Sequence, residues 1–249
     1  MSKTWDAIII GGGAAGLFCA GVAGQLGKRV LVLDHADVLC EKIRISGGGR
    51  CNFTNVHSSP ANFLSLNPHF VKSALARYPA KEFIKLVQSY HIAYHEKHQG
   101  QLFCDDSAKQ IIEMLLAECA KGHVDIRHPV SVQSVSNMAG EWLVKTNAGE
   151  ERARSLVMAT GGLPVPAIGA TAYSLDIAKQ FGLKIVDPRP ALVPLSFTSG
   201  EFDNLIDLSG LSLPVRIAAG SKGKRYGACR FNEDLLLTHK GLSGPAVLQ

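Results

Sequence analysis

Apolar residues recur at two spacings along this chain, and the two spacings predict strands that alternate with helices. Runs of consecutive apolar residues are typical of strands buried on both faces of a parallel sheet, whereas apolar residues three and four positions apart are typical of helices with one buried face. Strands are predicted at 6–10, 28–34, 92–95, 101–103, 124–127, 130–135, 141–146 and 155–162, and helices at 67–77, 80–90, 107–121 and 173–181. Turns near Gly140 and at 147–149 join the strands after residue 130 into a β-meander.

The pattern changes near residue 188, where prolines at 188, 190 and 194 interrupt it. Beyond them, short strands are predicted at 192–197, 213–219, 224–231 and 235–238, followed by a helix that begins near Pro245. We therefore expect an α/β domain at 1–188 and the N-terminal part of a second, β-rich domain at 189–249. The chain stops at Gln249, a few residues into that last helix, so the second domain is expected to be incomplete.

The first predicted strand breaks into glycines, and Gly11, Gly13 and Gly16 fit the pattern G-x-G-x-x-G before a helix. In this context the first glycine permits a tight turn, the second lets a diphosphate approach the backbone, and the third lets helix and strand pack closely. The second strand ends at Asp34, twenty-one residues after Gly13, where a carboxylate can bind a ribose hydroxyl. The stretch therefore predicts a dinucleotide-binding βαβ unit, with a glycine-rich turn in an ordinary core as the alternative.

Two later stretches also suit a polar ligand. Residues 46–52 read Ser-Gly-Gly-Gly-Arg-Cys-Asn, where backbone N–H groups come close to a ligand and Arg50, with Lys42 before it, offers charge. The strand that ends at Ala159-Thr160-Gly161-Gly162 leaves room at its carboxyl end, where open α/β sheets bind ligands. The alternative for residues 46–52 is a mobile surface loop, and the alternative for residues 159–162 is an ordinary loop after a strand that binds no ligand.

Composition adds little evidence for a nucleic-acid or metal site. The 249 residues carry 26 basic and 21 acidic side chains, and their formal charge of +5 is mild. Basic residues gather at Lys222, Lys224, Arg225 and Arg230, where we expect a solvated hairpin and keep polyanion binding as the alternative. His91, His95 and His98 suggest a metal site, because histidines four positions apart can share a helix face, but the stretch alternates like a strand and offers no cysteine or clustered aspartate, so we expect no metal.

Cysteine use and hydropathy favour a cytoplasmic protein. The six cysteines include no C-x-x-C pair and no export signal precedes them, so a disulfide framework is not expected. Residues 7–26 are uncharged but contain six glycines, which argues against a membrane span. No later stretch is long and apolar enough to cross a bilayer.

The glycine pattern, the acid after the second strand, the meander and the late Ala-Thr-Gly-Gly together resemble the FAD domain of the glutathione-reductase type. Further stretches look like the bacterial BaiN-type flavoproteins, described as NAD(P)/FAD-dependent oxidoreductases, across essentially all 249 residues: Lys42-Ile43, 46–55, 159–162, Leu192-Val193-Pro194 and 238–245. The family usually reads Leu-Gly-Arg-Lys where this chain has Leu39-Cys40-Glu41-Lys42. Its members also continue well past this length, so the resemblance implies a C-terminally truncated chain.

The resemblance implies an FAD site. Its residues would be Gly11, Gly13, Ala14, Ala15 and Gly16 at the pyrophosphate, Asp34 at the adenosine ribose, Lys42, Ser46, Gly47, Gly48, Gly49, Arg50, Cys51 and Asn52 along the ribityl chain and isoalloxazine, Val130 at the adenine through its backbone, and Ala159, Thr160, Gly161 and Gly162 closing the pocket. His239 and Cys51 are the candidates for catalysis, with a structural loop histidine and an inert buried thiol as their alternatives.

The expected function is an FAD-dependent oxidoreductase that transfers a hydride between the flavin and a small organic substrate. Because the sequence has no second G-x-G-x-x-G, NAD(P)H is expected only as a transient electron donor, or oxygen reoxidises the flavin. Three alternatives stay open: a flavin-dependent enzyme that modifies RNA, a dinucleotide-binding fragment without turnover, and a broken gene product that aggregates.

Overall fold

The computed structural model describes residues 4–198, 200–220 and 229–248. Contacts divide the chain into two compact units, Met1–Ile185 and Val186–Gln249, and each is described by itself. Among the described residues, no helix combines the length and the apolarity that a bilayer crossing requires.

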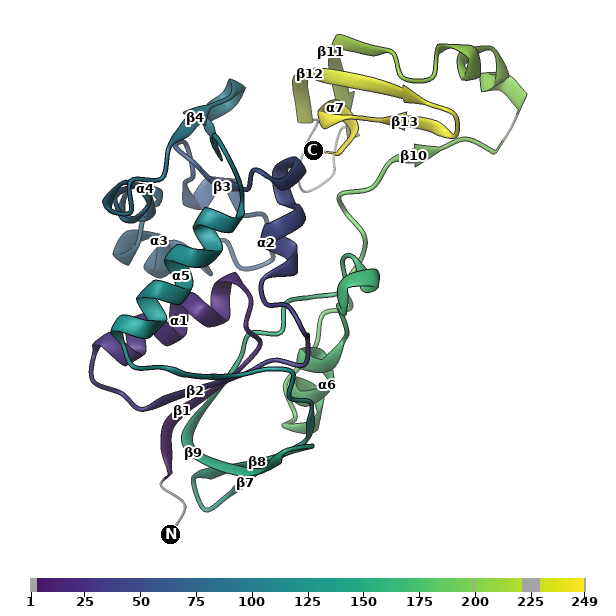
Figure 1. The fold of residues 1–249 in the computed structure, drawn as a ribbon. Helices are drawn as coiled ribbons and strands as arrows, with labels where there is room; N and C mark the ends of the chain where they lie inside the picture. The colour runs from purple at the N-terminus through teal and green to yellow at the C-terminus, as the bar shows by residue number, and fades with distance from the viewer. Residues whose placement is uncertain (1–3, 199, 221–228, 249) are drawn as a thin grey trace. The chain divides into compact units, whose positions relative to one another are not determined.

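The first unit contains a six-stranded sheet in the order β6-β2-β1-β9-β8-β7 and a three-stranded sheet in the order β3-β5-β4 (Figure 1). The strands are β1 (Trp5–Ile10), β2 (Val30–Leu33), β3 (Asn52–Asn55), β4 (Tyr94–Glu96), β5 (Gln101–Cys104), β6 (Asp125–Arg127), β7 (Val132–Met138), β8 (Glu141–Thr146) and β9 (Gly149–Met158). The helices are α1 (Ala14–Gln25), α2 (Glu41–Ile45), α3 (Lys72–Arg77), α4 (Ala80–Ser89), α5 (Lys109–Lys121) and α6 (Tyr173–Gln180).

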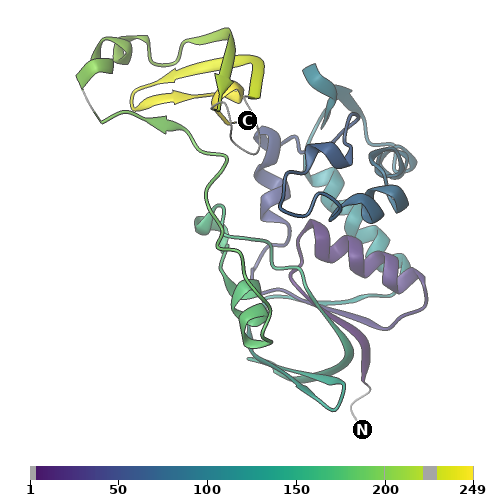
Figure 2. The ribbon, with the colours of Figure 1, turned by 180° about the vertical axis from the view of Figure 1, so that it is seen from behind.

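Strands β6, β2, β1 and β9 run parallel, and β8 and β7 continue the sheet antiparallel as the predicted meander. Because side chains alternate along a strand, β1 and β2 contribute to two cores. Ile9 and Val32 pack with α1 and α5 on one face, where both views show these helices side by side (Figures 1 and 2). Ile8 and Leu31 pack with β7, β8 and α6 on the other. The predicted Rossmann-like α/β fold is confirmed.

Two local predictions for the first unit were wrong. No helix or strand was predicted between Asp34 and residue 67, but this stretch forms α2, a 3-10 turn over Ser46–Gly49 and β3. The helix expected from residue 67 begins only at Lys72, because Asn67 holds a turn instead: its side-chain oxygen accepts from the N–H of His69 and its carbonyl accepts from that of Phe70.

The second unit is a four-stranded antiparallel sheet in the order β10-β13-β12-β11, with a short helix. Its elements are β10 (Leu195–Ser196), a 3-10 helix (Gly200–Leu208), β11 (Ser212–Ala219), β12 (Cys229–Thr238), β13 (Gly241–Ser243) and α7 (Pro245–Leu248). Two strands were expected at 224–231 and 235–238. From residue 229, where the described part begins, they form the single strand β12, which pairs with β11 without interruption. The strand expected at 192–197 is only two residues long, and Pro194, which lacks an N–H, precedes it.

Candidate dinucleotide-binding site

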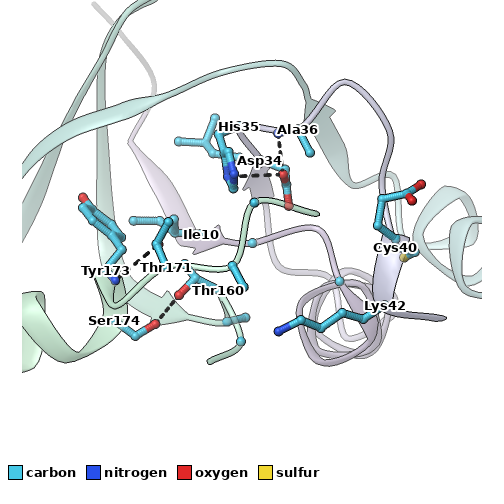
Figure 3. A pocket seen from close by; sticks show the side chains of 18 of the residues that line it. Ile10, Asp34, His35, Ala36, Cys40, Lys42, Thr160, Thr171, Tyr173 and Ser174 are labelled. Carbon is cyan, nitrogen blue, oxygen red and sulfur yellow. Dashed lines mark hydrogen bonds and ion pairs between the residues drawn. The ribbon is translucent and has the colours of Figure 1, made fainter. Parts of the chain in front are cut away.

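The carboxyl ends of β1, β2 and β9 meet at one edge of the large sheet and border a cavity of about 800 Å³ (Figure 3). Two backbone hydrogen bonds join these ends, from the N–H of Gly11 to Leu33 at 2.8 Å and from the N–H of Ala159 to Ile10 at 2.8 Å. The cavity therefore lies at the position where ligands bind in open α/β sheets.

The three motif glycines have different surroundings. Gly11 has φ +112°, and an added Cβ would lie 2.4 Å from the carbonyl oxygen of Ala159. A Cβ on Gly16 would lie 1.8 Å from the carbonyl oxygen of Gly11, so this position holds helix and turn together. A Cβ on Gly13 would meet nothing within 4 Å. Gly11 and Gly16 therefore serve packing, and Gly13 leaves the backbone open to the cavity.

The N-terminus of α1 opens on the same space. Gly13 is its N-cap and supplies no side-chain hydrogen bond, and the first turn holds no acidic residue. Ala14 and Ala15 are exposed and line the cavity. Their N–H groups and the positive end of the helix dipole are suited to an anion such as a phosphate.

Asp34 lies at the end of β2, and its carboxylate is held by two backbone groups. Oδ2 accepts from the N–H of Gly12 at 2.5 Å, and Oδ1 accepts from the N–H of Ala36 at 2.8 Å. Its side chain is 14% exposed and lines the cavity. Because each carboxylate oxygen has further acceptor capacity, the fixed group can still accept from a ligand hydroxyl.

Polar groups from three segments complete the wall. Lys42 of α2 donates from Nζ to the carbonyl of Gly162 at 3.0 Å, which places its charge beside the end of β9. The hydroxyls of Thr160 and Ser174 form a hydrogen bond, and both residues line the cavity (Figure 3).

Tyr173 also lines the cavity, and its hydroxyl is buried without a hydrogen-bond partner among the described residues. Its ring packs in the apolar cluster of Ile8 and Leu31, and burial raises the pKa of the phenol. A buried hydroxyl without a partner costs free energy, so this side chain lowers the stability of the fold.

Cys40, at the position where the resembled family has glycine, has a left-handed backbone with φ +62°. This conformation is costly for a residue with a side chain. Its Sγ donates to the carbonyl of Gly12 at 3.2 Å. Burial raises the pKa of the thiol to about 12, and the Asp34 carboxylate adds to the effect. The thiol is therefore protonated and unreactive at neutral pH.

The structure brings many of the predicted residues together but not all. Those that line the cavity are Gly11, Gly13, Ala14, Ala15, Asp34, Lys42, Val130, Ala159, Thr160 and Gly161. The N–H of Val130 donates to the carbonyl of Asp34 at 2.7 Å, so only its carbonyl is left for a ligand. Gly16 is buried beneath the turn, and Gly162 takes part through its carbonyl alone.

The loop from Ser46 to Asn52 does not line this cavity. It packs on β5 instead: a Cβ on Gly47 would lie 2.7 Å from the ring of Phe103, and the carbonyl of Arg50 accepts from the N–H of Cys104 at 2.9 Å. Cys51 is buried, and burial raises the pKa of its thiol, which matches an inert side chain better than a catalytic one.

Other predicted candidates lie elsewhere. His239 is exposed in the turn between β12 and β13 of the second unit. Three residues of the basic hairpin, Lys222, Lys224 and Arg225, lie outside the described residues. His95 Nδ1 forms a hydrogen bond with Oδ1 of Asp105 at 2.7 Å, and the described ranges contain no group of three or more His, Cys, Asp and Glu that could hold a metal ion.

Sequence reasoning missed several residues of the cavity wall, among them His35, Thr171, Tyr173 and Ser174. No motif contains them. His35 lies here because it follows Asp34 at the end of β2, whereas Thr171, Tyr173 and Ser174 lie here because the chain returns after β9 and passes beside that end (Figure 3).

A family model described as the HI0933-like protein Rossmann domain matches residues 5–243. The chain belongs to this family. An Escherichia coli (strain K12) protein named ribosomal RNA dihydrouridine synthase is 48% identical over 247 residues, which are 99% of this chain and 60% of that protein. A Clostridium scindens protein named 3-dehydro-bile acid delta(4,6)-reductase is 25% identical, over 97% of this chain and 58% of that protein.

The HI0933-like chain thus spans about 60% of the length of these relatives. A solved structure of glycine oxidase from Geobacillus kaustophilus has a TM-score of 0.45 and 15% identity, covering 74% of this chain and 60% of that one. The narrower resemblance to BaiN-type flavoproteins stays a prediction.

Proposed function

We infer that this chain binds FAD in the cavity at the carboxyl ends of β1, β2 and β9 and belongs to a flavin-dependent oxidoreductase. The observation that carries the inference is the open backbone at Gly13 beside the free N-terminus of α1, with Asp34 fixed next to the same turn by Gly12. These residues fit a dinucleotide: amides for the diphosphate and a carboxylate for a ribose hydroxyl. Bound FAD would supply the hydride chemistry.

The residues of the chain contribute binding and orientation. Ala14 and Ala15 would donate their N–H groups to the diphosphate, and the ammonium group of Lys42 would add positive charge to the wall. Asp34 would fix the adenosine ribose, since its two backbone donors hold the carboxylate in one orientation.

The substrate class that we favour is a uridine in ribosomal RNA; on sequence grounds the alternative was only an RNA-modifying flavoenzyme, with no RNA or base specified. Its support is the name of the Escherichia coli relative at 48% identity. Forming dihydrouridine adds a hydride to one carbon of the C5=C6 bond and a proton to the other, which is within the range of a flavin reductase. The bile-acid reductase at 25% identity supports the second candidate, reduction of a small organic substrate with NAD(P)H as transient donor.

The test begins with FAD. We expect added FAD to raise the melting temperature of the purified chain and its flavin absorbance to remain after gel filtration. Reduced flavoprotein mixed with ribosomal RNA should then yield dihydrouridine, measured by mass spectrometry of the digested nucleosides. A chain that ignores FAD overturns the proposal. A chain that binds FAD but leaves RNA unchanged, while oxidising NAD(P)H with a small enone, favours the second candidate.

A further inference from the structure

The formal charge of the chain is concentrated in one part of the first unit. Residues 42–109 contain 9 Lys and Arg and 4 Asp and Glu, so their formal charge is +5. The rest of the chain contains 17 basic and 17 acidic residues and is formally neutral, so residues 42–109 account for the net charge of the whole chain. Residues 42–81, which we call the acid-free segment, contain no acidic residue at all. The six basic residues of this segment are Lys42, Arg44, Arg50, Lys72, Arg77 and Lys81.

Large apolar side chains are displayed in the middle of the acid-free segment. Every residue from 61 to 70, the exposed loop, is exposed, with Phe63 at 45% and Phe70 at 73%. Leu64 and Leu66 are exposed beside them. Exposed aromatic rings in basic surroundings are typical of surfaces on which nucleic-acid bases stack.

Local hydrogen bonds of the exposed loop hold its backbone, although its side chains reach no core. Ser59 and Asn62 form a reciprocal cap at its start, and the hydroxyl of Ser65 donates to the carbonyl of Asn67 at 2.6 Å. The N–H of Phe70 donates to the same carbonyl at 3.2 Å. The rings are therefore presented by an ordered backbone, which lowers the entropic cost of binding.

The neighbouring cations are available to a partner. Lys72, Arg77 and Lys81 are exposed, and no ion pair among the described residues involves them. Lys85, by contrast, is paired with Glu82 at 3.0 Å. Three such cations on α3 and at the start of α4, close in sequence to Phe70, are suited to a run of phosphates.

We propose that the exposed loop, α3 and the start of α4 form a binding surface for single-stranded RNA, with Phe63 and Phe70 stacking on bases and Lys72, Arg77 and Lys81 contacting phosphates. The inference rests on the ribosomal RNA substrate proposed above. The charge of the acid-free segment favours RNA over a protein as the partner. Forty residues without a carboxylate repel no phosphate of an RNA chain, whereas a protein surface, which carries charges of both signs, has little need of such a segment.

The experiment measures binding of a fluorescein-labelled single-stranded oligouridine to the full chain by anisotropy at several salt concentrations. The triple variant Lys72→Glu, Arg77→Glu and Lys81→Glu is compared with Lys28→Glu, Lys179→Glu and Lys184→Glu, which reverses three exposed cations elsewhere in the first unit and has the same net charge. A second pair compares Phe63→Ala, Phe70→Ala with Leu26→Ala, Leu183→Ala, which also removes exposed apolar side chains.

We expect the first triple variant to lose binding and its control to keep most of it. The log–log salt slope of the first triple variant should be smaller by about 0.7 for each phosphate that the protein no longer neutralises. The phenylalanine variant should bind roughly 5- to 150-fold more weakly for each stacked base, unlike the leucine control. FAD binding should be equal in all variants.

Three results would overturn the proposal: equal losses in variants and controls, no RNA binding by the parent chain, or a phenylalanine variant that changes only the oligomeric mass, which would indicate a protein interface. Because FAD binding is measured separately, its loss in the parent chain would count against the proposed function instead.

Discussion

Replacing two glycines of the same motif should separate packing from ligand binding. In Gly16→Ala the new methyl would lie 1.8 Å from the carbonyl oxygen of Gly11, in a turn that backbone hydrogen bonds tie to the ends of β2 and β9. Overpacking against backbone at this distance should cost about 3 kcal/mol or more. In Gly13→Ala the methyl meets nothing within 4 Å, at a backbone φ of −86° that alanine adopts freely.

The stability of Gly13→Ala should stay close to that of the parent chain. Alanine is a poorer N-cap than glycine, which lowers the free energy of unfolding by up to about 1 kcal/mol. Alanine also restricts the backbone of the unfolded chain, which raises the free energy of unfolding by a compensating ~0.4–1 kcal/mol. FAD binding should nevertheless suffer, because the methyl occupies the space through which a diphosphate reaches the amides of α1. Losing one charge-assisted hydrogen bond of ~1.5–3 kcal/mol weakens binding roughly 10- to 150-fold.

Urea denaturation gives the stability of each variant, and FAD fluorescence titration gives the affinity. Gly140→Ala, in the β7–β8 turn, is the control for affinity: its φ of +86° should make alanine lower the stability by about 1 kcal/mol, while FAD affinity stays that of the parent chain because the turn does not line the cavity. Undiminished FAD affinity in Gly13→Ala would refute the assignment of this backbone to a diphosphate. Parent-like stability in Gly16→Ala would refute the packing role of that glycine.

Four further variants, at three positions, test the surroundings of the cavity and the rest of the first unit. Tyr173→Phe removes a buried hydroxyl that has no partner among the described residues, so urea denaturation should show a gain of about 1 kcal/mol; a loss of stability would mean that the hydroxyl is already satisfied. Cys40→Gly should be more stable than Cys40→Ala by about 1 kcal/mol, because only alanine keeps a side chain at φ +62°, and equal urea midpoints would contradict this. Burial opposes the ionisation of Glu118, but hydrogen bonds from Gln25, Lys121 and Tyr90 lower its pKa to about 2. The carboxylate therefore stabilises the fold above about pH 5, and this contribution is lost as the pH falls toward about 2. Glu118→Gln should flatten that part of the stability–pH curve, and an unchanged curve would exclude this role of Glu118.

The sequence alone determined the βαβ unit and the meander, because both depend on local information. The turn at Gly11 needs a positive φ, Asp34 follows its strand directly, and the turn at 147–149 joins adjacent strands. The tertiary structure alone decided what faces the cavity. The order β2-β1-β9 brings Asp34, Thr160 and Tyr173 to one edge although more than a hundred residues separate the first from the others. The tertiary structure also places the loop at 46–52 against Phe103 and away from the cavity. Strand order and loop packing depend on contacts between residues far apart in the sequence, and a local sequence pattern does not contain these contacts.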